Sequence, residues 1–280
     1  MRLTFSMKLF KKLSVYKQKY GLSKLLKTLS IKFIRAIFGR IIIFIAIFLY
    51  RIRLPNIILN GSVAINQLWP GRSEVILKLI KTFKNKITVL EIGTWFGEGS
   101  TKIFLKNLKP NSKLILLDTW EPYVSKDDLA NSQASTALMN QAGPLALSNL
   151  LINISKYPSI DTTVIKSGNN SLSFLKKNTF DFIYIDGSHY YETVKNDIDI
   201  AKKIINKKFG IICGDDLEIH PNKYLVNLSK KFKNIDFIEH DNSAFHPGVM
   251  LAVYEEFGEV NCKNGIWWIY MKNNKFTKTI

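Results

Sequence analysis

Short apolar runs alternate with longer amphipathic segments along the chain after residue 87. Apolar runs of about four to eight residues between polar or glycine positions are typical of buried strands, and apolar residues repeated every three or four positions are typical of helices. The helical period is clearest in 190–206, where Val194, Ile198 and Ala201 share one face and Lys195 lies on another.

This alternation predicts an α/β fold with a doubly wound, mostly parallel sheet. The predicted strands are 88–92, 113–118, 162–166, 180–185 and 209–213. The predicted helices are 99–107, 145–157, 171–177, 190–206 and 222–232. Two later apolar runs, 249–254 and 266–270, have no predicted crossover helix between them, so we expect them to form an antiparallel C-terminal edge.

The first 53 residues follow another pattern. Residues 8–32 mix basic and apolar side chains at helical spacing, and 41–50 are ten consecutive apolar residues. Ten helical residues extend about 15 Å, roughly half of a hydrocarbon core of about 30 Å. A longer span would include Arg35 and Arg40, which are costly inside a bilayer. A secretory signal also fits poorly, because no small-residue cleavage site follows the apolar run.

Charge separates the N-terminal segment from the rest of the chain. Of the 40 Lys and Arg residues, 13 lie in residues 1–53, which contain no Asp or Glu. The other 27 lie in the rest of the chain together with all 22 Asp and Glu residues, so that part is only mildly basic. We therefore predict two parts: a basic, apolar helical segment at 1–55 that lies on the anionic inner face of the cytoplasmic membrane, and a domain at 56–280. Packing of the helix on its own domain or in a homo-oligomer, and a true span, remain alternatives.

Neither a nucleic-acid partner nor a disulfide framework or zinc site is expected. A nucleic-acid arm does not need ten consecutive large apolar residues, so we expect no nucleic-acid partner. The two cysteines, Cys213 and Cys262, form no CxxC pair, which supports neither a disulfide framework nor a zinc site and favours a cytoplasmic location.

Residues 89–100, VLEIGTWFGEGS, predict a strand, a glycine-rich turn and a helix start. The G-x-x-x-G-x-G spacing differs from the G-x-G-x-x-G that cradles a pyrophosphate. Asp118 lies 21 residues after Gly97, at the end of the next strand, where a carboxylate can meet ribose hydroxyls. A ligand with a ribose and no phosphate fits this pattern, and S-adenosylmethionine is such a ligand.

Several residues near these strand ends are candidates for the cofactor site. Glu91 is unusual in a buried strand unless it accepts a hydrogen bond from ligand or backbone. The segment 167–170, SGNN, follows the third strand, where an adenine edge could be bound. The polar segment 121–142, between Trp120 and Gly143, is interpreted as an active-site lid or as a surface loop with a short helix. The predicted cofactor-binding residues are Glu91, Gly93, Trp95, Gly97, Ser100, Asp118, Trp120, Ser167 and Gly168.

Two further strands end on acids. FDFIYIDGSHYYE places Asp186 after one strand, and FGIICGDDLE places Asp215 and Asp216 after the next. If these strands are neighbours, three carboxylates converge with no nearby Lys or Arg, and they would favour Mg²⁺, with Ca²⁺ or Mn²⁺ as alternatives. In the structural alternative, one Asp caps the following helix and the others are solvated.

His189 is the best candidate for a general base, because its ordinary pKa lies near neutrality and it follows Asp186 by three residues. We therefore predict His189 and Asp186 as catalytic residues. A His that only forms a hydrogen bond at the start of a helix is the alternative. His246, in FHPG, is not assigned to the site.

With these motifs in this order, the region from about 65 to 270 resembles the class I S-adenosylmethionine-dependent methyltransferases. It is similar to the branch of macrolide-sugar O-methyltransferases and the proteins called cephalosporin hydroxylases. The resemblance rests on LEIGTWFGEGS, LLDTW, IYIDGSHYYETVKNDI and GDD. It implies that Glu91 and Asp118 bind cofactor, with Asp118 on the ribose, that Asp186, Asp215 and Asp216 hold Mg²⁺, and that His189 is the base. Sugar-methylating relatives often have Glu-Asp in place of the Asp pair.

The expected reaction is methyl transfer from S-adenosylmethionine to a hydroxyl of a small molecule or sugar, with a lipid-linked glycan as one acceptor class. Three other functions fit the sequence less well. An RNA methyltransferase would need stacking positions that are not apparent. A non-catalytic binding protein does not need the complete acid set, and a nicotinamide dehydrogenase has a different glycine spacing.

Overall fold

The computed structural model describes residues 71–121, 139–168, 175–240 and 243–280, together with the single positions 22, 26, 41, 44, 45, 48 and 68. The chain divides into two compact units, Met1–Asn56 and Ile57–Ile280. The predicted lid falls largely on residues 122–138, which lie outside the described residues.

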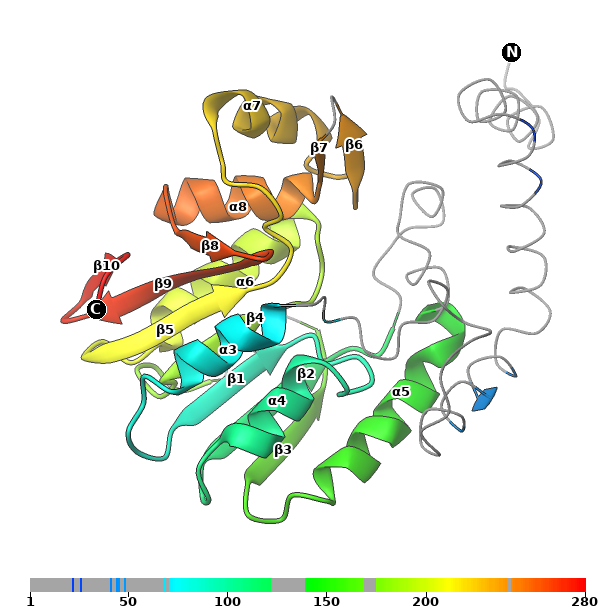
Figure 1. The fold of residues 1–280 in the computed structure, drawn as a ribbon, viewed down its shortest axis with the longest axis vertical. Helices are drawn as coiled ribbons and strands as arrows, with labels where there is room; N and C mark the ends of the chain where they lie inside the picture. The colour runs from blue at the N-terminus through cyan, green and yellow to red at the C-terminus, as the bar shows by residue number, and fades with distance from the viewer. Residues whose placement is uncertain are drawn as a thin grey trace. The chain divides into compact units, whose positions relative to one another are not determined.

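An eight-stranded sheet organises the second unit (Figure 1). Its path is β10-β9-β5-β4-β1-β2-β3, and β8 pairs with β9. The strands are β1 (Thr88–Ile92), β2 (Lys113–Asp118), β3 (Asp161–Lys166), β4 (Phe182–Ile185), β5 (Phe209–Gly214), β8 (Asn261–Lys263), β9 (Ile266–Lys272) and β10 (Lys275–Thr277). Neighbours among β1 to β5 are parallel, whereas β9 runs antiparallel to both β5 and β10. The predicted α/β fold and its antiparallel C-terminal edge are confirmed.

Helices cover both faces of the sheet. They are α3 (Arg72–Ile80), α4 (Ser100–Asn107), α5 (Met139–Ile154), α6 (Tyr191–Ile204), α7 (Lys223–Phe232) and α8 (Pro247–Phe257). In Figure 1, α3 and α4 lie in front of the sheet and α6 lies behind it. A separate two-stranded sheet pairs β6 (Ile238–His240) with β7 (Ser243–Phe245). Of the predicted helix 171–177, positions 171–174 lie outside the described residues and 175–177 are not helical.

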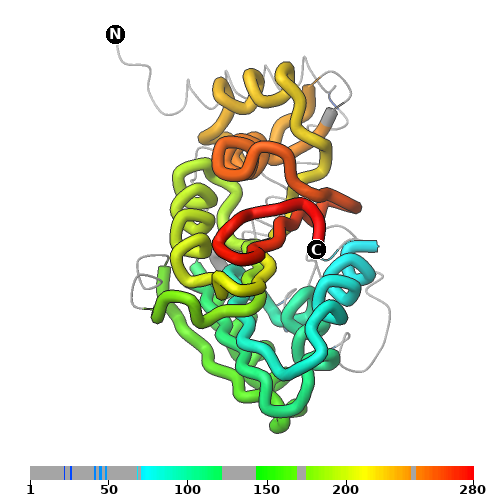
Figure 2. Tube along the Cα trace, turned by 90° about the vertical axis from the view of Figure 1, so that its left-hand side faces the viewer, coloured from blue at the N-terminus to red at the C-terminus, as the bar shows by residue number. Residues whose placement is uncertain are grey.

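The prediction of a strand at 249–254 is wrong, because this run lies within α8. The helix packs against both α6 and α7, and Figure 2 shows α7 and α8 next to each other. Val249, Met250, Leu251, Ala252 and Val253 are all buried, so the run lacks the exposed positions that normally reveal a helical period. Pro at the first turn of α8 was the signal for a helix, since Pro is favoured there.

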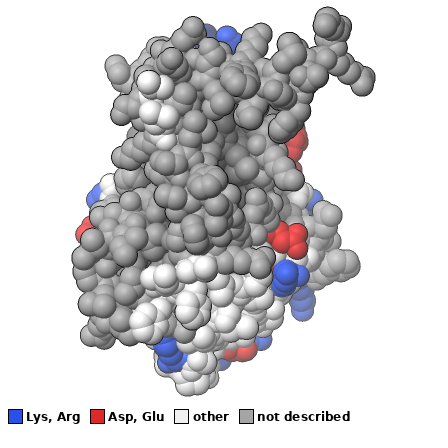
Figure 3. Space-filling view, turned by 90° about the vertical axis from the view of Figure 1, so that its right-hand side faces the viewer, with Lys and Arg blue, Asp and Glu red and all other residues white. Residues whose placement is uncertain are grey.

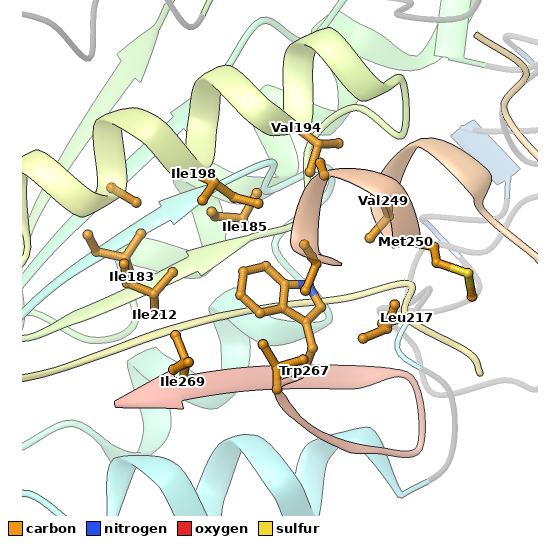
Figure 4. Packing of buried hydrophobic residues seen from close by; sticks show 14 of the residues in the cluster. Ile183, Ile185, Val194, Ile198, Ile212, Leu217, Val249, Met250, Trp267 and Ile269 are labelled. Atoms are coloured by element: carbon orange, nitrogen blue, oxygen red, sulfur yellow. The ribbon is translucent and has the colours of Figure 1, made fainter. Parts of the chain in front are cut away.

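Alternation along β4 divides the core into two layers. Phe182 and Tyr184 contact Phe104 of α4, with ring centroids 5.6 Å and 5.9 Å apart. Ile183 and Ile185 belong to the larger apolar cluster with α6 and α8. In Figure 4, Trp267 of β9 lies in the middle of this cluster. Both faces of β4 are therefore buried, and the end of the strand has a fixed position.

The described positions of the N-terminal unit expose apolar side chains. Ile41, Phe44, Ile45 and Phe48 lie at helical positions and are 42–63% exposed. Among the described residues, the structure contains no helix long and apolar enough to cross a membrane. On the described part of the face in Figure 3, basic and acidic side chains lie among uncharged ones.

Candidate active site

The glycine-rich turn after β1 lies directly against the end of β4. Gly93 has a φ of 85°, a region that side chains disfavour. A Cβ at this position would overlap the backbone carbonyl oxygen of Asp186. The β1–β4 register explains this approach, because Ile92 pairs with Ile185, the residue before Asp186. The predicted cofactor turn and the first predicted catalytic acid are therefore neighbours.

Asp118, at the end of β2, organises that turn. Its Oδ2 accepts hydrogen bonds from the backbone N–H groups of Thr94 at 2.8 Å and Trp95 at 3.0 Å. Its Oδ1 accepts from the backbone N–H of Trp120 at 2.7 Å. The carboxylate thus joins the ends of β1 and β2, and Oδ1, which accepts one of these hydrogen bonds, retains a further lone pair for a ligand hydroxyl.

Glu91 is fully buried in β1 beside the turn. The Ser100 hydroxyl donates to Glu91 Oε1 at 2.5 Å, whereas Oε2 has no hydrogen-bond partner among the described residues. Burial raises the pKa of Glu91 to about 8, although the Ser100 hydrogen bond opposes this shift. A buried carboxyl oxygen without a partner is costly, and a donor from a ligand would satisfy it.

The other predicted cofactor residues lie around the same strand ends. Trp95 and Trp120 both have a φ of 49°, and the Trp120 indole donates to the Trp95 carbonyl at 3.1 Å. Ser167, which is followed by Gly168 after β3, donates its backbone N–H to the Asp118 carbonyl at 3.0 Å. Gly97 has a φ of 70° in the turn itself. The structure therefore brings these positions to one edge of the sheet.

The three predicted metal ligands follow the neighbouring strands β4 and β5, where Ile185 pairs with Gly214. Burial, and then the charges of Asp215 and Asp216, raise the pKa of Asp186 well above its ordinary value. Burial and the charge of Asp216 raise the pKa of Asp215 to about 7. The expected crowding of the three acids is present.

The expectation that no Lys or Arg lies near these acids is wrong. Arg72, at the start of α3, is buried and pairs with Asp215 Oδ1 at 2.5 Å and with Asp216 Oδ1 at 3.3 Å. The Arg72 Nε also donates to the backbone carbonyl of Asn264 at 3.1 Å. Sequence reasoning missed this cation because it precedes Asp216 by 144 residues and lies outside every strand-end motif.

His189 lies between two carboxylates. Its Nε2 is 3.0 Å from Asp216 Oδ2, and its Nδ1 is 2.8 Å from Asp236 Oδ1. Burial acts to lower the pKa of His189, but the charges and hydrogen bonds of Asp216 and Asp236 raise it well above its ordinary value. Asp236 is 1% exposed and was not predicted as a site residue.

His246, which the sequence analysis left out, belongs to the same cluster. It caps the start of α8, and its ring centroid lies 4.1 Å from that of His189. Its Nδ1 is 2.6 Å from Glu218 Oε1 and 3.9 Å from Asp216 Oδ1. The FHPG motif was the available signal, because a His just before a helix-starting Pro has a fixed backbone direction.

An oxygen-only Mg²⁺ site fits this arrangement poorly. Arg72 pairs with Asp215 Oδ1 and the Tyr184 hydroxyl donates to Oδ2, so both oxygens already have a partner and the charge of Asp215 is compensated. The described part of the chain contains one group of three residues that could hold a metal ion, and it consists of His189, Asp216 and His246. The assignment of Asp186, Asp215 and Asp216 as Mg²⁺ ligands stays a prediction.

Comparisons with known proteins found one family model and several distant solved structures. Residues 90–217 match the family model described as a methyltransferase domain. No match was found among curated proteins. The crystal structure of the O-methyltransferase TomG from Streptomyces achromogenes, involved in tomaymycin synthesis and solved with S-adenosylmethionine, is 12% identical with a TM-score of 0.47; the match covers 81% of this chain and 86% of that one.

Two other solved structures extend the comparison. An O-methyltransferase from Bacillus cereus, solved with S-adenosylhomocysteine, is 14% identical with a TM-score of 0.46, over 86% of this chain and 95% of that one. The CurJ carbon methyltransferase is 17% identical with a TM-score of 0.35, over 51% of this chain, which spans only 34% of CurJ. These distant similarities do not indicate which atom is methylated. From the family match, residues 90–217 are a methyltransferase domain that uses S-adenosylmethionine, and the chain is an enzyme.

Proposed function

We propose that the domain transfers the methyl group of S-adenosylmethionine to a hydroxyl oxygen of a small molecule or sugar. The observation that carries this proposal is the contact between the glycine-rich turn at Gly93 and Asp186, which begins the cluster of acids and histidines. A cofactor held by the turn has titratable groups beside it, and a hydroxyl has to lose a proton as it attacks the methyl carbon.

Two groups are proposed to take that proton. The pKa of Asp186 is raised well above its ordinary value by burial and by Asp215 and Asp216, so its carboxylate is a stronger proton acceptor than an ordinary aspartate. His189 has Asp236 beside Nδ1 and Asp216 beside Nε2, so the neutral imidazole can accept the hydroxyl proton on Nε2 while both carboxylates stabilise the imidazolium that forms. The rest of the catalytic contribution is positioning of the acceptor oxygen in line with the sulfonium methyl.

The proposed reaction does not require the predicted Mg²⁺ ion. When bound, such an ion would lower the pKa of a coordinated hydroxyl and orient the acceptor. Because Arg72 already compensates the charge of Asp215, no step of the proposed reaction depends on the ion.

The proposal extends to where the enzyme acts. Ile41, Phe44, Ile45 and Phe48 are spaced i, i+3, i+4 and i+7, so they share one helical face, and all four are exposed. Eleven Lys and Arg residues precede this face in the sequence. These features support attachment to the anionic inner face of the cytoplasmic membrane, which would favour a lipid-linked glycan as acceptor.

The test is the identity of the methylated product. The full-length protein, incubated with methyl-labelled S-adenosylmethionine and a glycolipid extract, should yield label in O-methyl sugars after acid hydrolysis. His189→Ala and Asp186→Asn should each lower kcat by about 10²–10⁴-fold and still bind cofactor. His220→Ala is a matched control, because His220 is exposed. Label recovered only in N-methyl or C-methyl products would overturn the proposal.

A further inference from the structure

A cluster with one carboxylate and two imidazoles lies at the ends of β4 and β5 and at the start of α8. Potential ligand atoms of His189, Asp216 and His246 lie within 4.8 Å of one another. The residues come from three separate parts of the chain, and the burial of His246 and the pairing of β4 with β5 fix their positions. The cluster is therefore built by the fold and does not depend on one flexible loop.

Both imidazoles are oriented in the same way by a carboxylate behind them. The Nδ1 of His189 lies 2.8 Å from Asp236, and the Nδ1 of His246 lies 2.6 Å from Glu218. Metal-binding histidines almost always donate their second ring N–H to such a group, because this bond fixes the tautomer and the ring direction. With Nδ1 protonated in both rings, the lone pair that can bind a metal ion lies on Nε2 in each.

The two Nε2 atoms meet different environments. The Nε2 of His189 lies 3.0 Å from Asp216 Oδ2, the carboxylate of the cluster. His246 is only 1% exposed, and its Nε2 is buried with no hydrogen-bond partner among the described residues. A buried ring nitrogen without a partner needs an explanation, and an ion is one of the few groups that can satisfy a lone pair there.

The position of Arg72 determines which of the two neighbouring acids, Asp215 or Asp216, can bind a metal ion. It pairs closely with Asp215, whose other oxygen accepts from the Tyr184 hydroxyl at 3.3 Å. Asp216 is farther from Arg72, at 3.3 Å, and its oxygens lie 3.0 Å from His189 Nε2 and 3.9 Å from His246 Nδ1. Asp215 is thus paired with the guanidinium of Arg72, whereas Asp216 lies beside the two imidazoles.

We propose that His189, Asp216 and His246 bind a divalent transition-metal ion. Two imidazoles and one carboxylate match the ligand preferences of ions such as Zn²⁺, Co²⁺ or Fe²⁺, whereas Mg²⁺ prefers oxygen ligands. The inference concerns the site of the proposed function, but it does not depend on the acceptor or on methyl transfer. In the competing arrangement, His189 is a protonated bridge between Asp216 and Asp236 and no ion binds.

The experiment is a Co²⁺ titration of the metal-free, tag-free, full-length protein in detergent, without cofactor or acceptor. Visible absorption and calorimetry should show one Co²⁺ per chain, retained in the presence of a large excess of Mg²⁺. His246→Gln should abolish the absorption band. Glu218→Gln should lower the Co²⁺ affinity by about 10–100-fold, as expected for loss of an orienting carboxylate.

Two variants separate this site from the oxygen-only site. The Asp215→Asn variant should still bind Co²⁺, since Asp215 is not a ligand in the proposed site. It would lose Co²⁺ binding if the carboxylates of Asp186, Asp215 and Asp216 were the ligands. His220→Ala, an exposed histidine, is the control for adventitious binding. Circular dichroism establishes that each variant is folded. Absence of Co²⁺ binding by the folded wild-type protein, or unchanged binding in folded His246→Gln, would overturn the proposal.

Discussion

The backbone carbonyl oxygen of Asp186 occupies the space into which a side chain on Gly93 would project. The relationship joins the cofactor turn after β1 to the acid after β4, and it holds only while residue 93 has no Cβ. The pair therefore couples the geometry of cofactor binding to the geometry of the acid cluster.

Gly93→Ala should disrupt both at once. The new Cβ would overlap the Asp186 carbonyl, and the φ of 85° adds a strain of about 1–2 kcal/mol. We expect loss of cofactor binding in calorimetry and a lower free energy of unfolding. Gly258→Ala is the matched control, because Gly258 also has a positive φ, 66°, but no atom lies within 4 Å of a Cβ there. Equal behaviour of the two variants would show that the overlap is unimportant.

Asp118→Asn should weaken cofactor binding. Both oxygens of Asp118 accept backbone hydrogen bonds, so an amide nitrogen in place of one oxygen would face an N–H donor. Loss of one such charge-assisted bond costs about 1.5–3 kcal/mol, or roughly 10–100-fold in Kd measured by calorimetry. Asp161→Asn, at an exposed position on β3, is the control. An unchanged Kd would remove Asp118 from the cofactor site.

Arg72→Met should destabilise the fold strongly. Removal of the guanidinium leaves Asp215 buried without its ion-pair partner, which typically costs about 3–5 kcal/mol. Urea denaturation of the single variant, of Asp215→Asn and of the double variant forms a cycle that measures the coupling. We expect the double variant to be more stable than Arg72→Met alone. Strictly additive losses would mean that the pair contributes little.

Asp197 should make the stability of the fold depend on pH. It is 1% exposed, neither oxygen has a hydrogen-bond partner among the described residues, and burial raises its pKa to about 8. The folded state therefore keeps a proton that the unfolded chain releases above its ordinary pKa of about 4. The free energy of unfolding should fall as the pH rises from about 4 to 8.

Asp197→Asn should reduce that dependence, and the slope that remains comes from other buried acids with raised pKa values, such as Glu91 and Asp215. Urea denaturation at pH 5 and pH 8 measures the slope for the wild type and the variant, and Asp199→Asn, on the same helix, should retain the wild-type slope. A wild-type protein equally stable at both pH values, with the variant unchanged, would contradict the prediction.

Removal of residues 1–55 should abolish membrane attachment. The full-length protein should pellet with vesicles that contain anionic lipid, and less so as salt rises, because each nearby Lys or Arg contributes about 1 kcal/mol. Residues 56–280 should remain in the supernatant. Phe44→Ser combined with Phe48→Ser keeps every cation and should weaken binding through the apolar face alone. A full-length protein indifferent to vesicles would favour packing of the segment on protein.

The centre of the sheet could be predicted from sequence because β1, β2, β4 and β5 are short apolar runs that end at or just before a glycine or an acid. The predicted ranges of β1 and β2 match the structure at both ends. Strand ends in turn placed Asp118, Asp186 and Asp216 at one edge. The run within α8 was misassigned for the same reason that β4 was found, since complete burial hides any period.

Long-range partners could not be predicted in the same way. Asp236 meets His189 from a position 47 residues later, and Glu218 meets His246 across 28 residues. Neither contact follows from a strand end or a helical period, because both depend on how α7 and α8 pack beyond β5. Sequence periodicity identifies elements, whereas these contacts arise from the packing of one element on another.

Arg72 precedes the 90–217 segment and His246 follows it, yet both lie within 4 Å of Asp216, at the end of that segment. The stretch of chain that resembles a family is thus smaller than the stretch that completes the site. A laboratory fragment cut to 90–217, or a swap of that segment into another methyltransferase, would leave the acids without the cation and the imidazole that face them. Engineering of this enzyme should therefore treat Ile57–Ile280 as the indivisible unit.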